Sequence, residues 1–428
     1  MKHVVTELEL KNGARGLLIH VPGAQVMSTR VHFRAGTRYV RDKTIEETAH
    51  IMEHMAFGAN ARFRDAAEYD AEFTKNGAYF NATTADYSMV YMTDCADFEW
   101  DRILDLQQLS ITKPRFIEEE LKSEAGNVRN ELNGYLNNHM WVLWSKMAQV
   151  LGEDMLTWQE RLKTINNVTI ADIREHYRRT HTLANMRFVV AGDIKGRESK
   201  LEAMLESWEL PEGERLSIPV DELHRADPLL IKRKEATNFT FGLSMVVPRR
   251  LSDAEIDAMG FADHILNGTF RSRIFGGARK KGLAYGMWST ASANEHNSTW
   301  DFGTELDPEC AYELFQLIAK EVKAVIDGRI TDEEVEAARQ YALGRHQMGA
   351  QTAGQIARWY ADSYFFDGRI DDYDERPSEI QAVTRDRIVE TAREFINADC
   401  WLLGGIGNVE KAFVDGLNDQ LSPLFEKS

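Results

Sequence analysis

The chain contains 428 residues, of which 43% are hydrophobic and 28% are charged, and its formal net charge is −17. This composition is typical of a globular protein rather than a disordered or collagen-like one, and the length predicts more than one domain. The acidic balance argues against a general nucleic-acid-binding protein, which needs a basic surface.

The cysteines and the N-terminal residues indicate the compartment. Cys95, Cys310 and Cys400 are far apart and form no C-x-x-C pair, so we expect neither a disulfide framework nor a cysteine-based zinc site. The first residues lack the apolar core of a signal peptide, and the acidic Glu7 and Glu9 argue against a transit peptide. No stretch approaches the roughly 18 apolar residues of a membrane span. We therefore expect a cytoplasmic protein that does not bind membranes.

The first strong elements along the chain are a strand over residues 28–36 and a helix over residues 49–57. Thr44 and Glu47 stand just before this helix with the spacing of a capping box. In that arrangement the hydroxyl accepts from an early helix amide and the glutamate reaches back to the backbone. We expect them to cap the helix that carries the informative residues of the first half.

That helix carries His50, Glu53 and His54. Residues four apart share one helix face, so the two imidazoles can ligate one cation. Imidazole suits zinc, and a catalytic zinc usually has three protein ligands and a water. Glu53 lies beside the pair, where its carboxylate can accept a proton from a water acidified by the metal. The other histidines, for example His139, His264 and His346, are interpreted as core or surface residues.

A third ligand is expected further along the first half. Residues 78–93 are rich in aromatic and β-branched residues and predict strands, and residues 116–132 show helical periodicity. Glu124 and Glu131 on that helix are seven residues, or about two turns, apart and therefore lie on one face. We assign Glu131 as the third zinc ligand. We assign Glu124 as the carboxylate that holds a ligating histidine by its other ring N–H.

A linker is predicted over residues 209–228. This stretch contains Pro211, Pro219 and Pro228 together with Gly213 and mixed charges, a composition that interrupts both helices and strands. It divides the chain into a zinc-binding domain, residues 1–208, and a second domain, residues 229–428.

The second half repeats the pattern of the first. Helical stretches follow Val168 and Val383, which are 215 positions apart, and each leads into an apolar strand. Other elements recur with similar spacing: the strands over 28–36 and 239–248, and the capped helix starts at 44–47 and 252–255. Similar offsets across several elements indicate an internal duplication.

Only the first copy of the repeat carries the candidate metal-binding residues. Positions about 214 beyond Glu124 and Glu131 fall near Ala338 and Arg345, so the second copy lacks the acidic pair. A further helix is predicted over residues 331–347, and strands over residues 283–292 and 298–306. Strands mixed with helices, without strict β-α-β alternation, indicate two α+β domains.

The segment from His50 to His54 reads H-x-x-E-H, the inverzincin motif, and Glu131 follows His54 by 77 positions within an E-x6-E segment. On these motifs the chain resembles the pitrilysin/insulinase family of zinc metallopeptidases. It is most similar to the short two-domain branch, which includes mitochondrial processing peptidase subunits and their bacterial relatives. The resemblance spans nearly the whole chain. It implies one zinc ion per chain and two homologous domains, each a mostly antiparallel sheet packed with helices, that face each other across a chamber.

The resemblance also implies where a peptide substrate binds. Family members add the substrate as a strand to a sheet edge near the zinc, and residues 77–84 look like that edge. The substrate-binding residues implied there are Asn81, Ala82 and Thr84.

In members of this family, the second half of the chain supplies an arginine and a tyrosine to the active site, from a segment R-x-x-R-G-L-A-Y. Residues 282–285 match the end of this pattern, so Tyr285 is implied to contact the scissile carbonyl or the substrate backbone. The resemblance implies the arginine role for Arg279, which stands one position away from the usual spacing to the glycine.

These features together predict a zinc-dependent endopeptidase that acts on peptides or unfolded segments. Zinc would polarise the scissile carbonyl and acidify a water, and Glu53 would accept the proton and return it to the leaving amine. Two alternatives stay open: an active subunit that needs a second family-member chain in a heterodimer, and a non-catalytic scaffold. A homodimer is also open, and the sequence does not identify the peptide that is cleaved.

Overall fold

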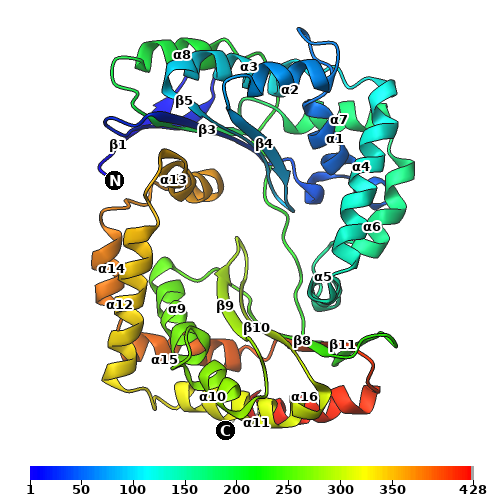
Figure 1. The fold of residues 1–428 in the computed structure, drawn as a ribbon, viewed down its shortest axis with the longest axis vertical. Helices are drawn as coiled ribbons and strands as arrows, with labels where there is room; N and C mark the ends of the chain where they lie inside the picture. Colours follow the sequence, from blue (N-terminus) through cyan, green and yellow to red (C-terminus); the bar gives the residue numbers. More distant parts are fainter. Residues whose placement is uncertain (426–428) are drawn as a thin grey trace. The chain divides into compact units, whose positions relative to one another are not determined.

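The computed structural model describes residues 1–425, which fold into two compact units (Figure 1). The first unit contains residues 1–134, 159–219 and 348–373. Among the described residues, the second unit contains 135–158, 220–347 and 374–425. Among the described residues, no helix is long and apolar enough to cross a bilayer.

The first unit is built on a six-stranded sheet with the order β1-β2-β6-β3-β5-β4. β2 and β6 pair in parallel, and the other neighbouring pairs are antiparallel. β4 is therefore an edge strand. The strands are β1 Val4–Glu9, β2 Arg15–His20, β3 Val26–Phe33, β4 Tyr79–Thr84, β5 Met89–Ala96 and β6 Met186–Gly192.

Eight α-helices belong mainly to the first unit. They are α1 Thr48–Ala56, α2 Ala66–Thr74, α3 Trp100–Thr112, α4 Glu118–Leu136, α6 Trp158–Thr164, α7 Ile170–Thr180, α8 Glu198–Glu206 and α13 Ala353–Asp367. Short 3-10 turns lie at Thr37–Tyr39, Lys43–Ile45, Asp97–Glu99 and Ile165–Asn167. α4 confirms the helix predicted over residues 116–132, and α7 and β6 confirm the elements predicted after Val168.

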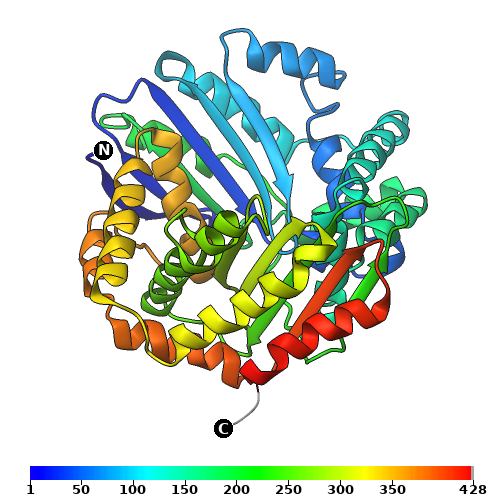
Figure 2. The same ribbon diagram turned by 60° about the horizontal axis from the view of Figure 1, so that its bottom comes forward.

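The second unit contains a five-stranded sheet with the order β7-β11-β8-β10-β9 (Figure 2). Its strands are β7 Leu229–Lys232, β8 Phe239–Val247, β9 Trp288–Ala293, β10 Ser298–Leu306 and β11 Trp401–Gly407. Its helices are α5 His139–Leu151, α9 Asp253–Asn267, α10 Arg273–Lys281, α11 Ala311–Ile326, α12 Asp332–Met348, α14 Arg376–Ala382, α15 Arg385–Asn397 and α16 Lys411–Phe425. A 3-10 turn lies at Pro308–Cys310.

The strand topology confirms the duplication and the α+β class. The order β2-β6-β3-β5-β4 in the first sheet corresponds to β7-β11-β8-β10-β9 in the second. In each sheet the first of these pairs is parallel and the next three are antiparallel. β1 is an additional strand of the first unit.

The two units are not the contiguous domains expected over residues 1–208 and 229–428, because each half contributes one helix to the unit of the other half. α5, from the first half, packs on β8 and β11 of the second unit, and α13, from the second half, packs on β3 and β6 of the first. Each helix lies against the sheet that it covers (Figure 1), and its apolar face shares a core with that sheet. Helical periodicity shows that such a face is buried but does not show against which sheet, so the sequence could not reveal this exchange.

The chain also passes between units at Pro219 and Val220, inside the stretch predicted as a linker, and residues 209–228 contain no helix or strand. The strand predicted over residues 283–292 begins later than expected, at Trp288. α10 ends at Gly282, whose φ of +70° suits a helix C-terminus. Leu283 and Ala284 then bury their side chains in the core before the strand starts.

Candidate metal centre

Helix α1 presents two histidines and a glutamate from one short segment. The ring centroids of His50 and His54 are 5.1 Å apart, as the four-residue spacing on a helix predicts. His50 and Glu53 are buried, with 7% and 8% of their surfaces exposed. Their burial follows from the apolar residues of the same helix, Ile51, Met52 and Met55, which anchor α1 in the core.

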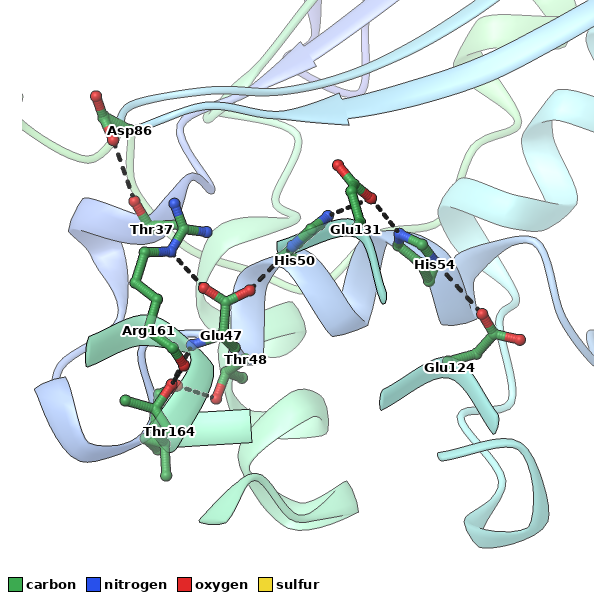
Figure 3. A network of polar contacts seen from close by, with 11 residues as sticks. Thr37, Glu47, Thr48, His50, His54, Asp86, Glu124, Glu131, Arg161 and Thr164 are labelled. Carbon is green, nitrogen blue, oxygen red and sulfur yellow. Dashed lines mark hydrogen bonds and ion pairs between the residues drawn. The ribbon is translucent and has the colours of Figure 1, made fainter. Parts of the chain in front are cut away.

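Helix α4 brings a carboxylate to the two imidazoles (Figure 3). Oε2 of Glu131 lies 3.5 Å from Nε2 of His50 and 3.7 Å from Nε2 of His54. One ligand atom from each of these three residues lies within 4.8 Å of the other two.

A contact near the start of α4 fixes this helix against α1. Glu120 accepts a hydrogen bond from the backbone N–H of Ala59, just beyond the end of α1, at 2.9 Å. A Cβ at Gly58 would lie 2.3 Å from the Glu120 carboxylate, so the glycine leaves room for this side chain where it now lies.

Each imidazole is held at its other nitrogen by a second carboxylate. Nδ1 of His50 lies 2.9 Å from Oε2 of Glu47, and Nδ1 of His54 lies 3.3 Å from Oε2 of Glu124. With Nδ1 hydrogen-bonded, the Nε2 atoms face Glu131, which is the orientation that a shared cation needs. The structure thus places Glu124 next to His54 (Figure 3).

The carboxylates set the charge of the histidines. Burial alone would lower the pKa of His50, but the hydrogen bonds with Glu131 and Glu47 outweigh it and raise the pKa to about 9. Burial likewise opposes the effect of Glu124 and Glu131 on His54, whose pKa is raised to about 9. Burial raises the pKa of Glu53, and the nearby histidines and Thr84 only partly offset this effect. The hydrogen bond with His54 lowers the pKa of Glu124.

The donor set fits a zinc ion. Tetrahedral zinc has bonds of about 2.0–2.1 Å to imidazole nitrogen and carboxylate oxygen, which places ligand atoms about 3.4 Å apart. The distances from Glu131 to the two Nε2 atoms, 3.5 and 3.7 Å, are close to that value. Two imidazoles and one carboxylate form a common ligand set of catalytic zinc, which leaves a fourth position for water or substrate.

The prediction that Thr44 and Glu47 form a capping box is wrong. α1 begins at Thr48, and the Glu47 side chain makes no cap hydrogen bond. Instead, Glu47 is fully buried, with its carboxylate between His50 and Arg161, and the N–H of Thr44 is satisfied by Asp42 at 2.8 Å. A hydrogen bond to a buried imidazole and an ion pair with a buried guanidinium make this carboxylate a poor candidate for backbone capping.

Sequence reasoning missed both Glu47 and Arg161. The three-residue spacing of Glu47 and His50 at the start of a helix was a usable signal, because such residues are neighbours on a helix surface. Arg161 lies on α6, 114 positions beyond Glu47, and no local pattern indicates their pairing. The matching prediction at Ser252 is confirmed, because the Glu255 carboxylate accepts from the backbone N–H of Ser252 at 2.7 Å.

The edge strand β4 packs beside α1. Asn81 is exposed, the side chain of Ala82 is buried, and Thr84 is partly buried near Glu53, whose pKa it lowers. Because β4 pairs with β5 on one side and is an edge strand, its other side offers unpaired backbone groups. Of the three residues implied to bind substrate, Ala82 could therefore contribute only through its backbone.

Arg279 and Tyr285 belong to the second unit, where the structure places them together. The Arg279 guanidinium lies over the Tyr285 ring, 4.4 Å from the ring centroid, and donates to the Tyr285 carbonyl oxygen at 3.0 Å. Tyr285 is 86% exposed. The one-residue shift of Arg279 along α10 is therefore compatible with a direct contact between the two side chains.

Two family models match the chain. Residues 15–153, which include the whole candidate metal centre, match a model described as insulinase, peptidase family M16. Residues 167–341 match a model described as the peptidase M16 inactive domain. An uncharacterized zinc protease of Streptomyces coelicolor is 21% identical over 407 residues, which cover 92% of this chain and 87% of that protein.

Solved structures show the same fold. A protease from Helicobacter pylori superposes with a TM-score of 0.84 at 17% identity, covering 95% of this chain and 100% of that one. A structure described as a peptidase M16 inactive domain from Pseudomonas fluorescens gives a TM-score of 0.83 at 16% identity, covering 95% and 98%. The two family models, which between them match residues 15–153 and 167–341, establish that the chain belongs to the pitrilysin/insulinase family, peptidase family M16.

Proposed function

We propose that this chain is a zinc-dependent endopeptidase. The observation that carries the proposal is the convergence of one ligand atom from each of His50, His54 and Glu131 within 4.8 Å of one another. These residues would hold one zinc ion, while Glu47 and Glu124 orient the imidazoles through Nδ1. Bound zinc would supply Lewis acidity that polarises a peptide carbonyl and lowers the pKa of a water.

Glu53 would act as the general base. It is adjacent to His54 in sequence, and burial raises the pKa of its carboxyl, which brings it closer to neutral pH and makes the ionised form a stronger base. Its carboxylate would accept a proton from the attacking water and deliver it to the leaving nitrogen of the substrate. Burial also limits the number of bulk waters that can compete for this carboxylate.

The substrate would bind as a strand on the free side of β4. Backbone pairing gives affinity without much sequence demand, which suits an enzyme that acts on varied peptides. The exposed Asn81 would add one side-chain contact. Tyr285 and Arg279 would contribute from the second unit, with the tyrosine hydroxyl contacting the scissile carbonyl or the substrate backbone.

Other features stay predictions: the chamber between the two homologous domains, a homodimer or a heterodimer with a related chain, and the cytoplasmic location. The scaffold alternative is less favoured, because the chain retains His50, Glu53, His54 and Glu131 together. A catalytically degraded relative has no need to keep all four.

The test uses the purified full-length chain, zinc, and a library of internally quenched peptides. Wild type should cleave, a chelator should abolish cleavage, and added zinc should restore it. Glu53→Gln should bind one zinc per chain but lose turnover, whereas Glu119→Gln, an exposed substitution on α4, should behave as wild type. No cleavage by zinc-loaded wild type, alone or as the assembly found by size measurement, would contradict the proposal. Cleavage by Glu53→Gln would remove the assigned base.

A further inference from the structure

Glu47 occupies a fully buried position between the start of α1 and helix α6. Its Oε2 lies 2.9 Å from Nδ1 of His50, and its Oε1 accepts from Nε of Arg161 (Figure 3). Its backbone N–H donates to the hydroxyl of Thr164 at 3.3 Å, and that hydroxyl donates to the Arg161 carbonyl at 2.9 Å. Glu47 is 0% exposed and Arg161 is 7% exposed, so bulk water has little access to the hydrogen bonds between them.

For the neutral imidazole, which is the form that binds a metal, this arrangement specifies one tautomer of His50. A guanidinium has only donors and keeps its proton, so Arg161 always occupies Oε1. Oε2 is then the acceptor available to the imidazole, and it is satisfied when Nδ1 carries the hydrogen. In that tautomer the lone pair is on Nε2, the atom that lies 3.5 Å from Glu131.

We propose that Glu47, held by Arg161, is a positioning residue that fixes His50 in the tautomer and orientation needed for metal binding. The inference rests on the proposed zinc site and adds residues from outside the H-x-x-E-H and E-x6-E segments. Glu47 and Arg161 do not touch the metal or the substrate, and they act through His50.

The two histidines are held in different ways. The Glu124 side chain beside His54 is 22% exposed, and it also accepts from the Asn127 amide at 3.0 Å. The Glu47 side chain beside His50 has no exposed surface and is paired with a buried cation. His50 therefore has the more rigid support, because water and a surface amide can rearrange around Glu124 but not around Glu47.

A glutamine at position 47 distinguishes the effect of Glu47 on the orientation of His50 from its contribution to packing. Glu47→Gln keeps the size of the side chain but leaves one acceptor oxygen and adds an NH2 group. Arg161 needs that oxygen, so the NH2 group turns toward His50 and favours the tautomer with hydrogen on Nε2. That tautomer cannot ligate a metal through Nε2. Removing Arg161 as well, in Glu47→Gln/Arg161→Met, frees the amide oxygen to accept from Nδ1 again.

The experiment measures zinc affinity by competition with a chelator at fixed pH, for wild type, Glu47→Gln and Glu47→Gln/Arg161→Met. The matched control is Glu99→Gln, which alters another ion pair of the first unit, between the buried Glu99 and the partly exposed Arg102. Loss of such a supporting carboxylate typically weakens metal binding about 10- to 100-fold. We expect that loss in Glu47→Gln, recovery of most of it in the double variant, and no loss in Glu99→Gln.

Three results would overturn the inference: unchanged zinc affinity in Glu47→Gln, equal weakening in the single and double variants, or equal weakening in Glu99→Gln. If Glu47→Gln does not fold, imidazole NMR of zinc-loaded wild type decides. The Nδ1–H resonance of His50 should be shifted downfield by a strong hydrogen bond, and a shift typical of a water-exposed imidazole would contradict the inference. Wild type that binds no zinc would instead refute the proposed function, on which the inference depends.

Discussion

Nε2 of His50 lies 3.5 Å from Oε2 of Glu131, although the two residues belong to different helices. The H-x-x-E-H segment supplies two ligands from a single helix, and the third depends on how α4 packs against α1. The hydrogen bond from the Ala59 N–H to Glu120 is one of the contacts that link α4 to the segment after α1. The metal site is therefore a property of the first unit as a whole and not of the motif alone.

Substitutions of the two glutamates on α4 should lower the zinc affinity to different extents. Glu131→Gln replaces a charged ligand with a neutral amide and should abolish stoichiometric zinc binding. Glu124→Gln leaves all three ligands but disturbs the support of His54, so the affinity should fall about 10- to 100-fold. Chelator competition measures both, with the exposed Glu119→Gln as control. Equal effects of the two substitutions would contradict the assignment of ligand and support.

The edge-strand hypothesis predicts an effect on substrate binding rather than on chemistry. Asn81→Ala removes one side-chain hydrogen bond worth about 0.5–1.5 kcal/mol, so KM should rise roughly 2- to 13-fold while kcat changes little. Steady-state kinetics on a single quenched peptide test this. The control is Thr6→Ala on β1, the opposite edge of the same sheet. A kcat effect without a KM effect would place Asn81 elsewhere in the mechanism.

Tyr285 should act on turnover without affecting the metal. If its hydroxyl contacts the scissile carbonyl as charge develops, Tyr285→Phe should lower kcat by roughly 10²-fold, the effect of losing one donor to such a charge. Zinc affinity should stay unchanged, because Tyr285 belongs to the second unit. Arg279→Ala should lower kcat less, since Arg279 contacts the Tyr285 ring and carbonyl oxygen. Unaltered kinetics in Tyr285→Phe would exclude the residue from catalysis.

The second unit should lose stability as the pH rises from about 4 to about 6. Burial raises the pKa of Asp301 to about 6 and that of Asp263 to about 6. Because the pKa of each acid is higher in the folded protein than its unfolded value of 3.8, protonation of the acid stabilises the folded state. This contribution is fully present below about pH 4 and is lost as the pH passes 6. Each shift of about two units corresponds to up to about 3 kcal/mol.

Asparagine substitutions should separate the two acids. Asp301 accepts from the hydroxyls of Ser244 and Thr299, which can also accept, so Asp301→Asn should raise the unfolding free energy at pH 8 by about 1–2 kcal/mol. Asp263 accepts from Trp300 Nε1 and the backbone N–H of Ala291, which only donate. Asp263→Asn should therefore destabilise the fold by about 1–3 kcal/mol. Urea unfolding at pH 5 and pH 8 tests both, and a stabilising Asp263→Asn would contradict this reasoning.

The sequence predicted those features that depend on local spacing. The four-residue step from His50 to His54 and the seven-residue step from Glu124 to Glu131 each place two residues on one helix face, and the structure brings those faces together. The internal repeat likewise predicted two copies of one strand topology. Such inferences succeed because helix and strand geometry fix the local directions of side chains.

Features that depend on long-range packing were not predictable. Glu47 has the sequence spacing of a capping glutamate, but Arg161, from a distant helix, makes a buried ion pair the better arrangement. α5 and α13 have apolar faces that are recognisable in the sequence, yet each face covers the sheet of the other half. In both cases the partner is chosen by tertiary structure, about which a single sequence segment carries no information.

The most direct test of the central claim is anomalous X-ray diffraction at the zinc absorption edge from crystals of the zinc-loaded chain. We predict one anomalous peak per chain, within bonding distance of Nε2 of His50, Nε2 of His54 and a carboxylate oxygen of Glu131. A zinc-loaded crystal with no peak between these three side chains, or with Glu131 turned away from the bound ion, would contradict the account.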